Sequence, residues 1–221
     1  MKKTLLTIAA VAGASLAAHS QGQLYFENES ANGYVVTSSL GDGSGSGGTY
    51  AIVSSFTAEL WALPGPANTT SGLGIDAYGF LDPFMLISDG FSQVSNIGNI
   101  AGSAGEFRAP VAAIVQGTVS ANTVVAVVVW TGPATNLVQA LAGPGTTALG
   151  IMAFVQAIGP AQPYPSQNDL STGWNALPNS PRCAANGGVN DLIMWRVPEP
   201  TTLALTGLGG LLLLLMHRKK A

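Results

Sequence analysis

The charged residues are distributed very unevenly along this 221-residue chain, and that distribution constrains its fold more than any single motif. All four lysines and both histidines lie in the end segments, at Lys2, Lys3, His19, His217, Lys219 and Lys220. Residues 21–216 carry three arginines against all eleven acidic residues, a formal charge of −8. Because basic residues beside an apolar run stay on the cytoplasmic side of a membrane, both ends are typical of membrane targeting.

Composition excludes several classes of protein. Only 9% of the residues are charged and there is one cysteine, so a basic nucleic-acid binder, a disulfide scaffold and a Cys/His zinc module are all excluded. Residues 21–196 contain no histidine and no lysine. Without these bases, Ser-His-Asp, Cys-His and Ser-Lys catalysis cannot operate there. The sequence therefore predicts a protein that is not an enzyme and needs no cofactor or metal.

The first twenty residues are typical of a secretory signal peptide. Lys2 and Lys3 precede an apolar run over residues 5–18, and Ala18-His19-Ser20 provides a small-x-small cleavage site. We expect cleavage between Ser20 and Gln21, with a cut after Ala18 as the alternative. This signal helix would direct the chain to the general secretion machinery.

The other end of the chain has a second targeting pattern. Residues 201–216 are uncharged and finish in five leucines, and a basic tail containing Arg218, Lys219 and Lys220 follows over residues 217–221. A helix of this length spans about 24 Å, which is short for a hydrocarbon core of about 30 Å. The pattern predicts a transmembrane helix over 201–216 that holds the protein transiently in the inner membrane, with its basic tail in the cytoplasm.

Directly before that segment stand Val197, Pro198, Glu199 and Pro200. Each proline fixes φ and lacks an N–H donor, so residues 197–200 are expected to be extended. This motif, the short apolar segment and the basic tail, in that order over residues 197–221, resemble the PEP-CTERM sorting signal of exported bacterial proteins. The resemblance implies recognition by exosortase, a membrane-embedded protease-transpeptidase. It further implies transfer of the processed protein to the outer surface or the extracellular polysaccharide.

The domain between the two signals, residues 21–196, is predicted to be all-β, an antiparallel β-sandwich or jelly-roll-like domain. One short helix is expected over 136–142. Ser120-Ala121-Asn122 is expected to turn a hairpin between residues 111–119 and 123–130, and Val127-Val128-Val129 predicts a strand buried on both faces. The expected strands cover residues 24–28, 34–38, 56–62, 111–119, 123–130, 151–158 and 192–197.

The sequence thus predicts a non-enzymatic cell-surface or matrix protein, associated with the envelope or exopolysaccharide. Two alternatives remain. Trp174, in a proline-rich stretch expected to be a surface loop, is the candidate for stacking on a sugar in a carbohydrate-binding module. Two carboxylates could instead serve a hydrolase. The acids available for that are Glu59, Asp76, Asp82, Asp89 and Glu106.

Two further features leave alternatives open. Four aspartates in loop-like surroundings could hold a structural Ca²⁺, although no EF-hand spacing is present. These are Asp82, Asp89, Asp169 and Asp191. Cys183, the single cysteine, can link two chains or stay a free thiol.

Overall fold

The computed structural model describes residues 21–28, 31, 33–38, 50–83, 85–97, 104–109, 113–116, 121–142, 148–160, 168–178 and 190–196. These residues form eleven strands and three helices of four to six residues, so the prediction of an all-β domain is confirmed. The elements are β1 (Gln21–Tyr25), β2 (Val35–Ser38), β3 (Tyr50–Ile52), β4 (Thr57–Ala62), α2 (Met85–Ser88), β5 (Ser92–Ile97), β6 (Ala113–Gln116), β7 (Asn122–Trp130), α3 (Leu137–Ala142), β8 (Ala148–Ala157), β9 (Gly159–Pro160), β10 (Asn168–Asp169), α4 (Ser171–Trp174) and β11 (Leu192–Arg196).

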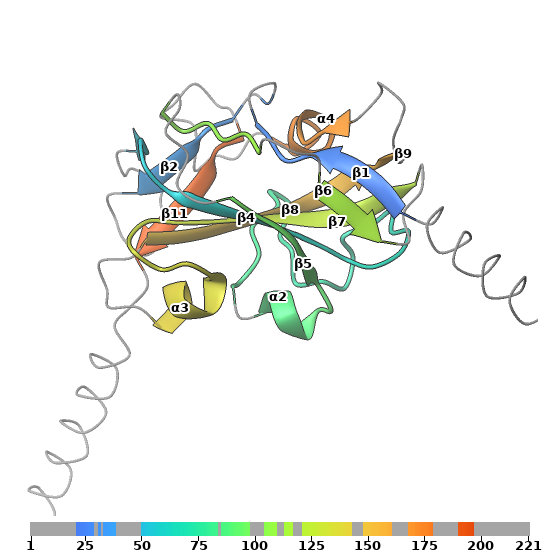
Figure 1. Ribbon diagram of the computed structural model, residues 1–221, viewed down its shortest axis with the longest axis horizontal. Helices are drawn as coiled ribbons and strands as arrows, with labels where there is room; N and C mark the ends of the chain where they lie inside the picture. Colours follow the sequence, from blue (N-terminus) through green and yellow to red (C-terminus); the bar gives the residue numbers. More distant parts are fainter. Residues whose placement is uncertain are drawn as a thin grey trace, which may run out of the picture.

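The strands form two sheets. The larger has seven strands in the order β3-β2-β11-β8-β7-β4-β5, and the smaller has β10, β1 and β6 in sequence with β9 also paired to β1. Figure 1 shows β1 and β6 lying over the long strands β7 and β8, with α2 and α3 on the opposite side. We call the side of the larger sheet that faces β1 and β6 its inner face, and the side that faces α2 and α3 its outer face.

The sequence explains why both faces are covered. In β7, Val125, Val127 and Val129 belong to a buried cluster shared with Leu24 of β1 and Val115 of β6. The alternate residues of the same strand, among them Val128 and Trp130, belong to a second cluster with Leu86 of α2 and Leu137 of α3. Successive side chains of a strand point to opposite faces, so a valine-rich strand without polar alternation fits only between two apolar layers. The prediction that Val127-Val128-Val129 is buried on both faces is confirmed.

Two predictions about strand pairing are wrong. The sheets are mixed, because β1 pairs with β10 and β2 with β11 in parallel, whereas an antiparallel arrangement was expected. The hairpin between 111–119 and 123–130 does not form either. Strand β6 pairs with β1 in the smaller sheet, and β7 pairs with β4 and β8 in the larger. Apolar residues of β6 and β7 both belong to the inner cluster. The chain therefore passes from the smaller sheet to the larger one between Gln116 and Asn122.

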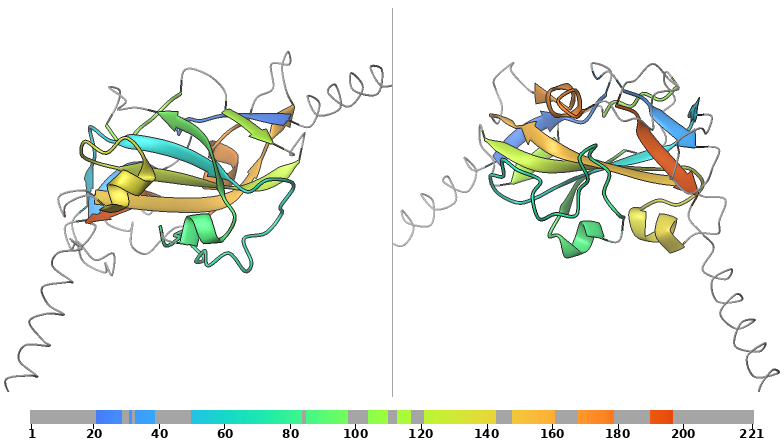
Figure 2. Two further views of the ribbon diagram at one scale, coloured as in Figure 1. Left: turned by 60° about the horizontal axis from the view of Figure 1, so that its bottom comes forward. Right: turned by 180° about the vertical axis from the view of Figure 1, so that it is seen from behind.

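Both edges of β8 are covered along most of the strand. On one side β7 pairs with its residues from 149 to 157, and on the other β11 reaches only Ala148 and Leu149. Farther along that second side, the N–H of Ala153 donates to the carbonyl of Gly79 at 2.7 Å, and α4 packs near Val155. Figure 2 shows α4 beside one end of β8, on the side opposite α2 and α3. An uncovered edge would invite pairing with another chain.

Candidate functional site

The last strand of the domain, β11, is the part of the structure that leads directly into the residues singled out as a sorting motif. It lies inside the larger sheet, where Leu192 pairs with Val35 of β2 and Arg196 with Ala148 of β8. Leu192 and Met194 are buried in the inner cluster. An interior strand has hydrogen-bonding neighbours on both sides, so β11 is a fixed point from which the chain continues into residues 197–200.

A buried polar cluster fixes the start of β11. The carboxylate Oδ1 of Asp191 accepts the backbone N–H of Tyr34 at 2.9 Å, and the N–H of Leu192 donates to the Tyr34 carbonyl, also at 2.9 Å. The indole Nε1 of Trp174 donates to the carbonyl of Asn190 at 2.5 Å. Asp191 is 1% exposed, and such buried polar groups need these partners to be tolerated. Together they set the position at which the final strand begins.

Glycine is required on one side of this cluster. A Cβ at Gly33 would lie 2.0 Å from the Asn190 carbonyl oxygen and 2.7 Å from Nε1 of Trp174. No side chain fits at those distances, so the close approach of residue 33 to the start of β11 depends on the missing Cβ.

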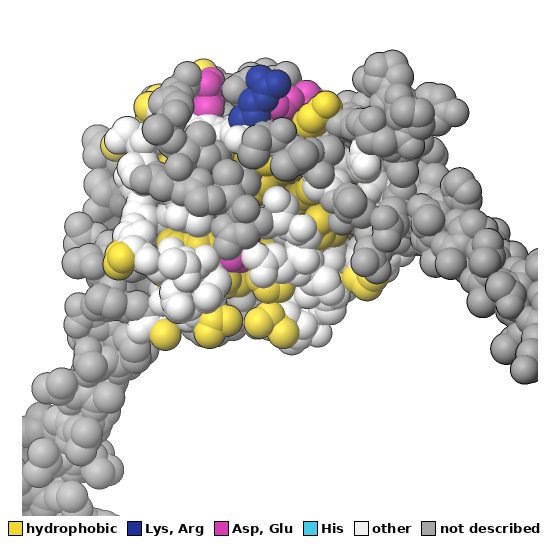
Figure 3. Space-filling view, viewed as in Figure 1, with side chains coloured by type: hydrophobic (Ala, Val, Ile, Leu, Met, Phe, Trp, Pro, Cys, Tyr) yellow, Lys and Arg dark blue, Asp and Glu magenta, His cyan; other side chains and the backbone are white. Residues whose placement is uncertain are grey.

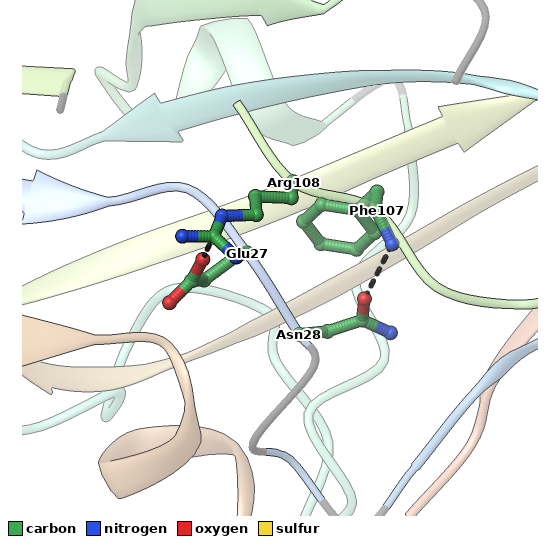
Figure 4. Close-up of polar contacts among 4 residues, drawn as sticks. All are labelled: Glu27, Asn28, Phe107 and Arg108. Carbon is green, nitrogen blue, oxygen red and sulfur yellow. Dashed lines mark hydrogen bonds and ion pairs between the residues drawn. The ribbon is translucent and has the colours of Figure 1, made fainter. Parts of the chain in front are cut away.

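A second set of polar contacts joins residues 105–108 to the residues that follow β1. The buried side-chain oxygen of Asn28 accepts the N–H of Phe107 at 2.6 Å, while its amide nitrogen donates to the Gly105 carbonyl at 3.1 Å. Next to it, Arg108 pairs with Glu27 at 3.0 Å (Figure 4). The Arg108 side chain is 61% exposed, so this ion pair contributes little to stability and its charge remains at the surface.

The far end of β11 lies beside the segment that enters α3. Arg196 pairs with Ala148, whose N–H donates to the Thr131 hydroxyl oxygen at 3.1 Å and whose carbonyl accepts the N–H of Thr131 at 2.9 Å. Six residues after Thr131, α3 begins at Leu137. The chain therefore leaves the described domain at the end of the larger sheet from which residues 131–137 lead into α3.

A buried carboxylate lies on that outer face. Glu59 of β4 has no exposed surface, and its Oε2 accepts the indole N–H of Trp61 at 2.9 Å. Desolvation by burial raises the pKa of Glu59 above its ordinary value, and hydrogen bonds from Trp61 and from the backbone of Leu137 partly oppose that rise. A carboxylate enclosed in this way cannot reach a substrate, so Glu59 is unavailable to the two-carboxylate hydrolase chemistry that the sequence left open.

The expectation that Trp174 is exposed for sugar stacking is wrong. Its side chain has no exposed surface and packs between Phe107 and Phe154, at ring-centroid distances of 6.3 and 6.0 Å. The proline-rich stretch that contains it includes β9, β10 and α4, and α4 turns the indole into the inner cluster. Burial of a large aromatic ring favours folding strongly, which outweighs the surface tendency of its polar neighbours.

The other acidic candidates do not gather into a metal site. Within the ranges that the structure describes, no group of three or more His, Cys, Asp or Glu residues could hold a metal ion. Asp191 and Asp169 instead accept backbone hydrogen bonds, the latter from Ser171 at 2.9 Å, and Asp76 caps its own turn through the N–H groups of Tyr78 and Phe80. These contacts give Asp76 and Asp169 a role in local turns and give Asp191 a role in joining residue 34 to the start of β11.

A cavity of about 360 Å³ opens where the edge strands β5 and β6 of the two sheets approach each other. Its lining contains no ionisable side chain, so it offers no acid, base or charge to a substrate. The lining residues are Ala62, Leu63, Pro64, Ser92, Gln93, Val94 and Val115.

The remaining predicted site residues, apart from Gln21, lie outside the described residues. These are Ser20, the motif residues Val197, Pro198, Glu199 and Pro200, the basic Arg218, Lys219 and Lys220, and Cys183. Gln21 is the first residue of β1, and its backbone pairs with Gln116. In the described part of the chain, no helix is long and apolar enough to cross a membrane; the segments 1–20 and 201–216 are not in that part.

Sequence reasoning missed the structural importance of Asn28 and Asn190. Asn190 and Asp191 directly precede the apolar strand Leu-Ile-Met-Trp, which is a signal for a polar group that fixes a strand end. No comparable pattern marks Asn28, whose partners at residues 105 and 107 are distant in sequence. Comparison of the chain with protein-family models, curated proteins and solved structures gives no match.

Proposed function

We propose that this chain is an exported, non-enzymatic protein of the cell surface or extracellular matrix, processed at its C-terminal sorting signal by an exosortase-like membrane protease. The signal comprises the motif Val197-Pro198-Glu199-Pro200, the apolar segment 201–216 and the basic tail. In this proposal residues 1–20 are removed on export, and residues 201–216 hold the protein in the inner membrane until processing releases it. The domain then associates with the envelope or exopolysaccharide.

One structural observation carries most weight. Strand β11 ends at Arg196, and the motif begins at the next residue. Because β11 ends at Arg196 and lies between β2 and β8, cleavage beyond residue 196 would remove none of the described strands from the larger sheet. A processing site directly after an interior strand would let the membrane-targeting segment be lost while the domain stays folded.

We also propose that the two sheets form a β-sandwich of the jelly-roll-like class acting as a structural module. The inner cluster between the sheets supports this assignment. Residues 21–196 contain no histidine or lysine, the most common activators of nucleophiles, which supports a structural role.

The sorting proposal is tested by changing the motif in the native host. Pro198→Ala, Glu199→Ala and Pro200→Ala together should abolish processing, so that mass spectrometry finds the protein only in the membrane fraction with its C-terminal peptide intact. The control is Pro163→Ala with Pro165→Ala, which removes the same Pro-x-Pro spacing elsewhere in the chain. Unchanged processing of the motif variant would disprove the sorting function.

The same measurement on the unaltered protein tests both ends of the chain. We expect a mature N-terminus at Gln21 and no peptide from residues 201–221 in protein recovered from the cell surface or medium. Recovery of surface protein that retains Met1 or Ala221 would contradict the proposed maturation.

A further inference from the structure

The outer face of the larger sheet carries a group of exposed apolar side chains on its two helices. Met85 and Ile87 of α2 are 41% and 60% exposed, and Val138 of α3 is 64% exposed. Neither helix contains an acidic or basic residue. We call these three side chains the α2–α3 patch. Among the described residues, three of the five exposed large apolar side chains lie on this face, the other two being Tyr34 and Ile52. Exposed apolar side chains that gather on one face are candidates for a contact surface.

The patch lies on the side where the chain leaves the domain. Arg196 pairs with Ala148, which is hydrogen-bonded to Thr131 just before α3. Figures 1 and 2 agree that α3 and the end of β11 lie toward the same end of the domain, while α4 and β1 lie on the opposite side. The apolar surface is therefore near the point from which the C-terminal segment departs.

The connection beyond β11 is short. Only residues 197–200 separate Arg196 from the uncharged segment 201–216, and two of those four residues are prolines with restricted φ. Four residues span at most roughly 14 Å when fully extended. A domain held to a bilayer by so short a connection keeps one side close to the lipid.

We propose that the α2–α3 patch rests on the surface of the lipid bilayer that holds residues 201–216. This inference depends on the membrane-anchored stage of the proposed function. Side chains of Met, Ile and Val enter the boundary between headgroups and acyl chains, where burial of apolar area stabilises the contact. The patch then orients the anchored domain so that the start of residues 197–200 faces the membrane.

Charged side chains limit the extent of this contact. In the space-filling view of Figure 3, acidic and basic side chains are visible along the upper edge and one acidic side chain near the centre, while hydrophobic side chains are visible along both the upper and the lower edge. Asp82 and Asp89 flank α2 and mark the limit of the patch. Anionic lipids repel acidic side chains, so the contact is confined to the uncharged helices α2 and α3 themselves.

The test uses the full chain, purified from a heterologous host and reconstituted into vesicles of phosphatidylethanolamine and phosphatidylglycerol. In a Cys183→Ser background, a fluorophore is attached at Ile87→Cys or Val138→Cys, or at Thr172→Cys as the control. Thr172 is exposed on α4, on the opposite side of the domain. Spin-labelled lipids should quench the fluorophore at residues 87 and 138 at least twofold more strongly than at residue 172.

Variants that introduce a negative charge test whether the apolar side chains cause the contact with the bilayer. With the fluorophore at Met85→Cys, the changes Ile87→Asp and Val138→Asp should reduce quenching to the level seen at residue 172, whereas Thr172→Asp should leave it unchanged. Equal quenching at all three sites in a chain that floats with the vesicles would overturn this inference and leave the anchor intact. A chain that does not float would overturn both the inference and the membrane-anchored stage.

Discussion

The two faces of the seven-stranded sheet use the same strands but build different kinds of core. On the inner face, strands β4, β7 and β8 pack against a second sheet, and three aromatic rings extend the contact from Phe26 through Phe107 to Trp174. On the outer face, the cover consists of two helices of four and six residues and the long connection from residue 63 to 83. The comparison indicates that the inner face supplies most of the stability, while the outer face tolerates a buried acid and leaves apolar side chains at the surface.

Removing a large side chain from the inner face should have the greatest effect. Trp174→Ala leaves a cavity between Phe107 and Phe154 and removes the donor to Asn190, so the free energy of unfolding should fall by about 3–5 kcal/mol. Urea denaturation monitored by circular dichroism measures this loss. Trp174→Phe, which keeps much of the ring volume, should lose less. A stable Trp174→Ala domain would mean that this ring is not central to the inner core.

A comparable truncation on the outer face should cost less. Leu86 is the fully buried side chain of α2. Leu86→Ala should lower the free energy of unfolding by about 2 kcal/mol, which is the lower limit for such a change. The loss is small because a helix of only four residues can shift to fill the space. The same denaturation experiment gives the value. A loss equal to that of Trp174→Ala would remove the proposed difference between the two faces.

The smallest expected effect is an increase in the free energy of unfolding. Burial raises the pKa of Glu59 in the folded protein, so the folded state binds a proton more readily than the unfolded chain. Stability is therefore greatest below the unfolded pKa of about 4.5 and decreases as the pH rises through the folded pKa. Glu59→Gln should remove that decrease and stabilise the domain near pH 7 by roughly 1 kcal/mol.

Thermal unfolding between pH 4 and pH 8 measures this dependence. The matched control is Asp82→Asn, which removes one negative charge from an exposed position. Parallel pH profiles for the unaltered protein and Glu59→Gln would show that the buried carboxylate has no influence on the stability of the outer face.

The sequence predicted the individual elements of the fold better than their partners. Valine-rich residues 122–130 and the alternating residues around Leu60 form strands as expected, and α3 forms within residues 136–142, because local patterning determines which face of each element is apolar. The pairing of β6 with β1 depends on residues about ninety positions apart, and no turn signal reports it. The parallel pairing of β2 with β11 is more distant still.

At the candidate site, too, the sequence predicted an element but not its long-range contacts. The position of the last strand was predicted, because Leu192–Arg196 is an apolar run beside polar residues. The burial of Trp174 was not, because its proline-rich surroundings are typical of a surface loop and its partners come from residues 107 and 154. Polar contacts such as Asn28 with Phe107 arise only when the complete backbone brings them together.

The place of β11 between β2 and β8 determines the order in which this protein can assemble. Among the described strands, β3 and β2 connect to the remainder of the larger sheet only through β11, so that sheet stays divided until residues 192–196 are in place. A chain threaded through a secretion channel from its N-terminus would therefore remain incompletely folded for nearly its whole length. If the chain is exported as proposed, the larger sheet can close only after residues 192–196 have crossed the membrane.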